Sequence, residues 1–385
     1  MTNTPSSVSP LPLPRELERT LEVFAHDEAR AITPSELTTL LETYTLAELL
    51  EASHRLTQRC ASQTFNTCTI INAKADGCSC DCAWCAQSRH WNPAPAETRL
   101  IDESIALAGA ERTLAYGIGR YSLVTAGRKL SPRTTREASA LLQTLREKTP
   151  ALELCASFGL MNEAELRQLK AAGLVRYHCN LETSDEHFKR VCTTHTREDK
   201  IATLEAARRA GLELCSGGLF GIGETEDDRI ELALTLRRLG IPSIPLNFLS
   251  PIEGTPLAHQ APLTDEAVLR TAIIFRFANP SAYLRLAGGR AQLSPNVTEQ
   301  LMYAGVNSAI LGDFLTTVGS SVAGDLTTAQ HVGYELEQAT QAALERGLPT
   351  ESTTPGTSCR PTCVPTTSTA ATIRIVPIEQ IEMTN

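Results

Sequence analysis

Short apolar or β-branched segments alternate with longer helical patterns from about residue 66 onward, and this alternation constrains the fold most. Strands are predicted at 67–73, 120–125, 152–157, 175–182, 212–216, 244–249, 283–286 and 308–311. Helical patterns lie between them, for example at 133–148, 162–172, 197–210, 227–239 and 265–277. Eight strands that alternate with helices over roughly 250 residues are what a (β/α)8 barrel requires. We therefore predict an α/β fold of the TIM-barrel type, with a doubly wound open sheet as the alternative.

Segments on either side of this region extend the predicted barrel. Amphipathic helices are predicted at 15–24 and 35–54, and a further helix at 327–346. Ser, Thr and Pro dominate 349–372, as in an irregular tail, and a strand-like run follows at 372–378. The predicted parts are a disordered amino terminus at 1–14, a helical extension at 15–60, the barrel at 61–330, and a carboxyl-terminal helix with a cysteine-containing tail at 331–385.

Composition limits the classes of function. The chain of 385 residues has 42% apolar and 21% charged residues, as soluble enzymes do. Its net charge of −9 disfavours a nucleic-acid partner. We find neither an apolar run of about 18 residues nor a signal-peptide pattern, and therefore expect a cytoplasmic protein with no membrane partner. In that reducing compartment, the 12 cysteines are better suited to metal ligation or burial than to disulfides.

Three closely spaced cysteines, Cys78, Cys82 and Cys85, form the pattern C-x3-C-x2-C. Thiolates in so short a loop can converge on one metal centre. Iron–sulfur clusters are usually held by four Cys thiolates, so three predict a [4Fe–4S] cluster with one iron open to a ligand. A structural zinc site or a redox C-x-x-C pair is the alternative. Cys80 is interpreted as a bystander in this loop.

Polar residues alternate with apolar ones along the predicted strands, and successive side chains of a strand point to opposite faces. The apolar sets suit packing against helices, so the polar sets are expected to face the barrel interior. They include Glu153, Cys155, His178, Asn180, Glu182, Glu213, Cys215, Asn247 and Arg285. Buried polar groups need partners, which favours a ligand or metal at the carboxyl ends of the strands. Taken singly, each cysteine could also be a core residue, and Arg285 could serve an internal ion pair.

A longer series of motifs closely resembles the biotin synthase family of radical S-adenosylmethionine (SAM) enzymes. The resemblance covers roughly residues 35–330, in order. It comprises N-A-K at 72–74, C-A-W-C-A-Q-S at 82–88, Y-S-L-V-T at 121–125, L-C-A-S at 154–157, N-L-E-T-S at 180–184, C-S-G-G-L-F-G-I-G-E at 215–224, P-L-N at 245–247, G-T-P-L at 254–257, L-R-L at 284–286 and L-T-T at 315–317.

The resemblance implies a function and cofactors. Cys78, Cys82 and Cys85 would hold the [4Fe–4S] cluster, and SAM would chelate its open iron. An electron from the cluster would cleave SAM, and the resulting 5′-deoxyadenosyl radical would take hydrogen from dethiobiotin, with sulfur then supplied by an auxiliary iron–sulfur cluster. The cofactors carry such chemistry and the protein positions them. Residues implied for SAM binding are Trp84, Asn180, Glu182 and Lys200.

The resemblance also implies the remaining site residues and partners. Dethiobiotin would contact Asn180, Asn247, Thr316 and Thr317, while Cys155, Cys215 and Arg285 would hold the auxiliary cluster. A flavodoxin- or ferredoxin-type electron donor and a homodimer are further expectations.

Departures from the family pattern concern the auxiliary cluster and SAM. Ser122 stands where a cluster cysteine is expected, and a hydroxyl oxygen is a harder ligand for iron than a thiolate. Cys359 and Cys363 in the tail are candidate replacements, so the auxiliary cluster is either [2Fe–2S] or a larger sulfur-bearing type. Lys200 stands near a usual arginine and lacks its bidentate fork. The other interpretation of the tail cysteines is that they are incidental. The remaining cysteines are interpreted as small buried residues: Cys60, Cys68, Cys179 and Cys192.

Two rival functions fit parts of the same pattern. Another radical SAM enzyme of this barrel, related to hydrogenase maturation or methylornithine synthesis, would not insert sulfur. A non-catalytic iron–sulfur electron carrier would not need a barrel with a polar interior.

Overall fold

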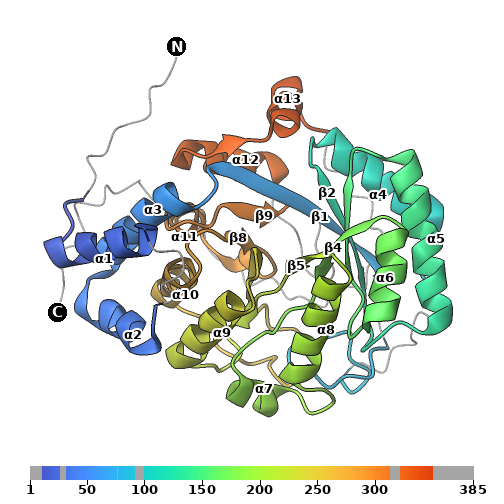
Figure 1. The fold of residues 1–385 in the computed structure, drawn as a ribbon, viewed down its shortest axis with the longest axis horizontal. Coiled ribbons are helices and arrows are strands. Elements are labelled where there is room, and N and C mark those ends of the chain that lie inside the picture. Colours follow the sequence, from blue (N-terminus) through green and yellow to red (C-terminus); the bar gives the residue numbers. More distant parts are fainter. Residues whose placement is uncertain (1–10, 27–31, 76, 92–98, 313–320, 350–385) are drawn as a thin grey trace.

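A closed parallel barrel forms the centre of the molecule (Figure 1). The computed structural model describes residues 11–26, 32–75, 77–91, 99–312 and 321–349. Neighbouring strands pair in parallel, and β1 pairs with β9 to close the ring. The strands are β1 (Thr64–Lys74), β2 (Arg120–Thr125), β3 (Glu153–Ser157), β4 (Leu174–His178), β5 (Glu213–Cys215), β6 (Gly218–Phe220), β7 (Ser243–Phe248), β8 (Tyr283–Leu286) and β9 (Ser308–Ile310). The predicted (β/α)8 fold is therefore confirmed.

The fifth position of the barrel is a strand interrupted in its middle. Both β5 and β6 pair with β7, and Ser216 and Gly217 separate them. The backbone of Gly217 passes so close to Pro245 that a Cβ at this position would collide with the Pro245 carbonyl. Glycine is required here because of that approach.

Helices surround the barrel on its outer side (Figure 1). Several of these helices begin with a capping box. In this motif a Thr or Asn side chain accepts from the backbone N–H of the acidic residue three positions later, whose side chain accepts from the backbone N–H of the Thr or Asn. Asn162, Thr196 and Thr225 begin such helices. The surrounding helices are α4 (Glu103–Ala115), α5 (Pro132–Lys148), α6 (Glu163–Ala171), α7 (Asp185–Val191), α8 (Arg197–Arg209), α9 (Glu226–Arg238), α10 (Asp265–Ala278) and α11 (Pro295–Tyr303), with a short 3-10 turn at Arg290–Gln292.

The amino-terminal extension contains more helices than predicted. It consists of α1 (Arg15–His26), α2 (Pro34–Thr43) and α3 (Leu46–Cys60), so a single helix at 35–54 was wrong. The break follows from Thr45, whose side chain caps α3 and forms a capping box with Glu48. Helix α3 packs against α10, which fixes the extension to the barrel.

The segment after the barrel is also divided. In place of one helix at 327–346, the chain forms α12 (Val322–Val332), a short strand β10 (Glu335–Leu336) and α13 (Gln338–Arg346). Gly333 ends α12 with φ +109°, a left-handed conformation that glycine adopts freely. Strand β10 pairs with the beginning of β1. The tail at 350–385, with Cys359, Cys363 and the strand predicted at 372–378, lies outside the described residues.

The predicted division of the strands into two faces agrees with the burial of their apolar side chains. Leu154, Ala156, Leu214, Leu284 and Leu286 are all buried. Polar interior residues near the amino-terminal opening form ion pairs: Arg120 with Glu153 and Glu213, and Arg176 with Glu213. Glu153 and Glu213 therefore belong to this opening and not to the carboxyl-terminal face. No helix among the described residues is long and apolar enough to cross a membrane.

Candidate active site

The loop that follows β1, here called the cysteine loop (residues 77–91), borders a cavity of about 210 Å³ at the carboxyl end of β4. Active sites of such barrels lie at this face. The cavity brings together residues predicted from separate parts of the sequence: Cys78, Cys82, Trp84, Cys85, Asn180, Glu182 and Lys200. The predicted cluster ligands and the predicted SAM contacts therefore share one cavity.

Hydrogen bonds within the cysteine loop fold it back on itself. Cys78 donates its N–H to the Gln87 carbonyl at 2.9 Å, and its own carbonyl accepts from Arg89 at 3.0 Å. The Ser88 hydroxyl donates to the Cys80 carbonyl at 2.6 Å. These bonds hold Cys78 next to the segment that follows Cys85, and all three cysteines line the same cavity.

Asp81 attaches the loop to the residues after α7. Its carboxylate accepts from the backbone N–H groups of Thr193 and Thr194 at 2.9 and 3.1 Å, and from both hydroxyls. Burial raises the Asp81 pKa, but the hydrogen bonds from Thr193 and Thr194 more than offset it and hold the pKa well below its ordinary value. Sequence reasoning missed Asp81, because a loop aspartate has no spacing signal.

The thiols of the loop differ in electrostatic environment. A hydrogen bond from Cys80 lowers the Cys78 pKa to about 6, whereas burial raises the Cys85 pKa to about 11. The Cys80 backbone N–H also donates to the Cys78 sulfur at 3.4 Å, and the interpretation of the Cys80 thiol as a bystander stays a prediction. Three cysteines that line one cavity with the buried Lys200 amine have the donor chemistry of an iron–sulfur site, since the thiolate is the form that binds metal.

A further thiol and an imidazole lie beside Cys82. The Cys192 sulfur is 3.7 Å from that of Cys82 and 3.3 Å from Nδ1 of His195, and the three donor atoms lie within 4.8 Å of one another. Cys192 is buried, as predicted, but it is also next to a predicted cluster ligand. The sequence separation of 110 residues gave no signal of this contact.

The predicted SAM contacts form a connected polar group. The Lys200 Nζ donates to the Asn180 carbonyl at 2.9 Å and lies 3.8 Å from a Glu182 carboxylate oxygen. Burial lowers the Lys200 pKa, but Glu182 and nearby thiols more than compensate, so the pKa is raised and the amine stays charged. Trp84 lies beside this group and makes an edge contact with Phe188 at 6.5 Å.

Glu182 has an unusual backbone. Its φ is +72°, the one non-glycine residue in the described part of the chain with a positive φ. The conformation is held by Gly217 and Leu219, which bond the Glu182 backbone at 3.1 and 2.8 Å. Such backbone strain is concentrated at functional sites. The predicted strand at 175–182 is therefore too long, since β4 ends at His178.

Deeper in the barrel lies a second group of predicted ligands. Cys155 and Cys215 are buried on β3 and β5, and their sulfurs have weak partners: the Glu153 carbonyl at 3.9 Å and the Ser243 hydroxyl at 3.5 Å. Ser122 is the register neighbour of Cys155. Arg285 is almost fully buried on β8, and its guanidinium donates to the Asn66 side chain at 2.6 Å.

The predicted substrate contacts are divided between described and undescribed residues. Asn247 donates to the Gly218 carbonyl and accepts from the Gly288 N–H, both at 2.9 Å, so its amide joins the start of β6 to the residues that follow β8. Thr316 and Thr317 lie outside the described residues, in the segment 313–320.

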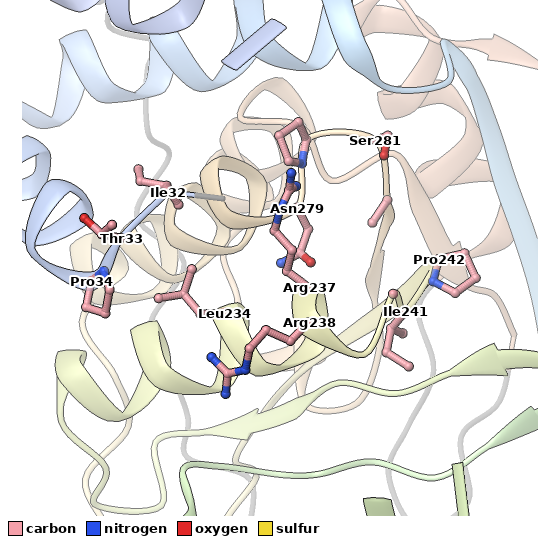
Figure 2. A pocket seen from close by; sticks show the side chains of 13 residues that line it. Ile32, Thr33, Pro34, Leu234, Arg237, Arg238, Ile241, Pro242, Asn279 and Ser281 are labelled. Atoms are coloured by element: carbon pink, nitrogen blue, oxygen red, sulfur yellow. The ribbon is translucent and has the colours of Figure 1, made fainter. Parts of the chain in front are cut away.

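A larger cavity of about 710 Å³ lies at the opposite end of the barrel, where β7 and β8 begin (Figure 2). Figure 2 shows Arg237 of α9 beside Asn279, which follows α10, while the guanidinium of Arg238 points away from Asn279. The amino-terminal face of a barrel serves stability and not catalysis. We therefore assign the active site to the smaller cavity.

Comparisons with known proteins agree with this geometry. Residues 73–236 match the radical SAM superfamily, and residues 245–335 match the biotin and thiamin synthesis associated domain. A biotin synthase from Porphyromonas gingivalis is 44% identical over 288 residues, covering 75% of this chain and 87% of the relative. The chain belongs to the biotin synthase family. Another family member, from Desulfotalea psychrophila, is 46% identical over 274 residues, covering 71% of this chain and 81% of the relative.

Solved structures of other proteins share the fold of this biotin synthase family member. A methylornithine synthase has a TM-score of 0.70 at 17% identity, covering 84% of this chain and 99% of the other. An FeFe-hydrogenase maturase from Carboxydothermus hydrogenoformans has a TM-score of 0.69 at 14% identity, covering 86% and 82%. At these identities the likeness is one of fold alone.

Proposed function

We propose that two iron–sulfur sites within one barrel carry the biotin synthase activity, in which sulfur is inserted into dethiobiotin to form biotin. The observation that carries the proposal is the shared cavity of Cys78, Cys82 and Cys85 with Asn180, Glu182 and Lys200. When bound, the [4Fe–4S] cluster supplies the electron that cleaves SAM. Cysteine thiolates are the usual ligands of its iron. The polar group of Asn180, Glu182 and Lys200 suits the charged amino acid part of SAM.

We assign the residues of the cavity separate tasks. Lys200 attracts the SAM carboxylate, because its amine is buried and charged. Glu182 and the Asn180 amide position the SAM amine and ribose, and Trp84 borders the adenine. The Asn180 Oδ1 already accepts from the Gly217 N–H at 2.9 Å, which fixes the orientation of its amide. Polar groups that are already oriented in this way need little free energy for reorganisation when the ligand binds.

We assign the deeper group to the auxiliary cluster, which supplies the sulfur. Cys155 and Cys215 provide thiolates from β3 and β5, and Arg285 provides positive charge from β8. Dethiobiotin is placed between the two clusters, near Asn180 and Asn247, with Thr316 and Thr317 as further contacts. A closed barrel supports this arrangement, because a carbon radical must be kept from water. A flavodoxin- or ferredoxin-type donor and a homodimer complete the proposal.

Anaerobic reconstitution of the full chain with iron and sulfide, followed by SAM, dithionite and dethiobiotin, tests this assignment. Biotin together with 5′-deoxyadenosine is expected. 5′-Deoxyadenosine without biotin would favour the rival function, a radical SAM reaction without sulfur insertion. Neither product from a redox-active cluster would favour an electron carrier.

Variants separate the two sites. Cys85→Ala is expected to abolish both products, because it removes a ligand of the SAM-binding cluster. Cys155→Ala is expected to abolish biotin while 5′-deoxyadenosine continues to form. Cys60→Ala, at the end of α3, is the matched control and is expected to retain both.

A further inference from the structure

Cys68, on β1, faces the barrel interior. The neighbouring Thr69 faces outward, since its hydroxyl bonds that of Thr113 in α4 at 2.6 Å. Asn66 faces inward, since its side-chain oxygen accepts from Arg285. Side chains alternate along a strand, so Cys68 shares the inner face with Asn66. The sequence indicated only a small buried cysteine at this position, but the structure places it on the inner wall.

The thiol of Cys68 belongs to the deeper group of donors. Its sulfur is 3.4 Å from Nη1 of Arg285. The Cys155 thiol interacts electrostatically with those of both Cys68 and Cys215. Strands β1, β3 and β5 thus each direct one thiol into the same interior, and β8 adds a guanidinium. No other protein group within the described residues gives the Cys68 sulfur a hydrogen bond.

Strand register relates Cys68 to Ser122. Ile70 pairs with Ser122, which in turn pairs with Cys155. Cys68 is two residues before Ile70 and therefore lies on the same face, diagonally across from Ser122. Two residues along a strand and one step between neighbouring strands place the Cα atoms of Cys68 and Ser122 roughly 8 Å apart. The Cys68 thiol therefore points into the same part of the barrel interior as a cysteine at position 122 would.

We propose that Cys68 is a thiolate ligand of the auxiliary cluster and takes the place that Ser122 cannot fill. A thiolate binds iron in such clusters better than a hydroxyl oxygen does. Cys155 and Cys215 alone offer two thiolates, and Cys68 raises the number to three. Arg285 then compensates the negative charge of the thiolates beside it. This inference rests on the auxiliary cluster of the proposed function.

The test uses a parent variant of the full chain in which Cys78, Cys82 and Cys85 are all replaced by Ala, so that iron bound after anaerobic reconstitution reports the deeper site. The parent is expected to keep iron and sulfide with a Mössbauer signal of its own. Adding Cys68→Ala is expected to lower both contents at least twofold. Adding Cys60→Ala, the matched control, is expected to leave them unchanged.

A second measurement does not depend on how Cys68→Ala folds. Replacing Cys68 by selenocysteine in the parent preserves shape, and X-ray absorption at the iron edge is expected to show iron–selenium scattering. The proposal is overturned if that scattering is absent while the parent holds iron, or if Cys68→Ala keeps the iron, sulfide and Mössbauer signal of the parent. A parent without iron would overturn the auxiliary cluster itself and this inference with it.

Discussion

The Asp81 carboxylate accepts two hydrogen bonds from Thr194, one from its backbone N–H at 3.1 Å and one from its hydroxyl at 2.8 Å. Asp81→Ala is expected to release the cysteine loop and lower the free energy of unfolding of the apoprotein by about 2 kcal/mol, since charge-assisted bonds are lost. Urea unfolding measures this, and reconstituted iron content should fall as well. Asp102→Ala, at an exposed helix start without a side-chain cap bond, is the control. Equal effects of the two changes would contradict the anchoring role.

Lys200→Met removes the buried amine that bonds the Asn180 carbonyl and faces Glu182. SAM affinity is expected to fall roughly tenfold or more, about 1.4 kcal/mol, because the positive charge is lost. Equilibrium dialysis of SAM against the reconstituted enzyme measures the affinity. Lys200→Arg keeps the charge and is expected to lose less. Unchanged affinity in Lys200→Met would remove Lys200 from the SAM site.

His178 gives the apoprotein a predictable pH dependence. Burial lowers its pKa from 6.5 to about 4. Below pH 6.5 the imidazole is protonated in the unfolded chain but stays neutral in the folded chain. The free energy of unfolding therefore falls as the pH drops toward 4, by about 2 kcal/mol at pH 5. Above pH 6.5 both states are neutral at this residue. Urea midpoints at pH 7, 6 and 5 should therefore fall more steeply in wild type than in His178→Gln, and parallel slopes would contradict the assignment.

Gly217→Ala tests the interrupted strand. A Cβ at this position would collide with the Pro245 carbonyl, and the expected loss is about 2 kcal/mol of unfolding free energy. Gly324→Ala in α12 is the matched control, since the nearest atom to its new Cβ is 3.6 Å away and Ala favours helix, so stability should be equal or higher. Thermal unfolding of both apoproteins distinguishes them, and a neutral Gly217→Ala would show that β5 and β6 can separate from β7.

The barrel was predictable because its signals are local. The strands at Arg120–Thr125 and Tyr283–Leu286 were predicted with their observed ends, since apolar alternation and flanking turns mark them. The helix breaks at Thr45 and Gly333 were missed, although both residues are recognised start or stop signals, because the apolar periodicity continues across them. Periodicity reports the face of a helix and is insensitive to a short interruption.

The cysteine loop was also predictable, because its three cysteines are close together in the sequence. The contacts of Asp81 with Thr194, and of Cys192 with Cys82, join residues more than 100 positions apart and have no local pattern. Cys68 was classed as a core residue because one alternating position cannot reveal its partner. Its contact with Arg285 spans 217 positions and depends on the closure of the barrel.

Strand β1 carries Cys68 and leads directly into the cysteine loop. An extended strand advances about 3.3 Å per residue, so the six steps from Cys68 to Lys74 span roughly 20 Å along the strand. Inserting or deleting one residue before Cys68 would turn its thiol toward the helices and shift every pairing with β2 and β9. The register irregularity of β1 lies between Asn72 and Lys74, beyond Cys68. Up to Cys68, β1 should therefore tolerate a conservative substitution better than any change in length.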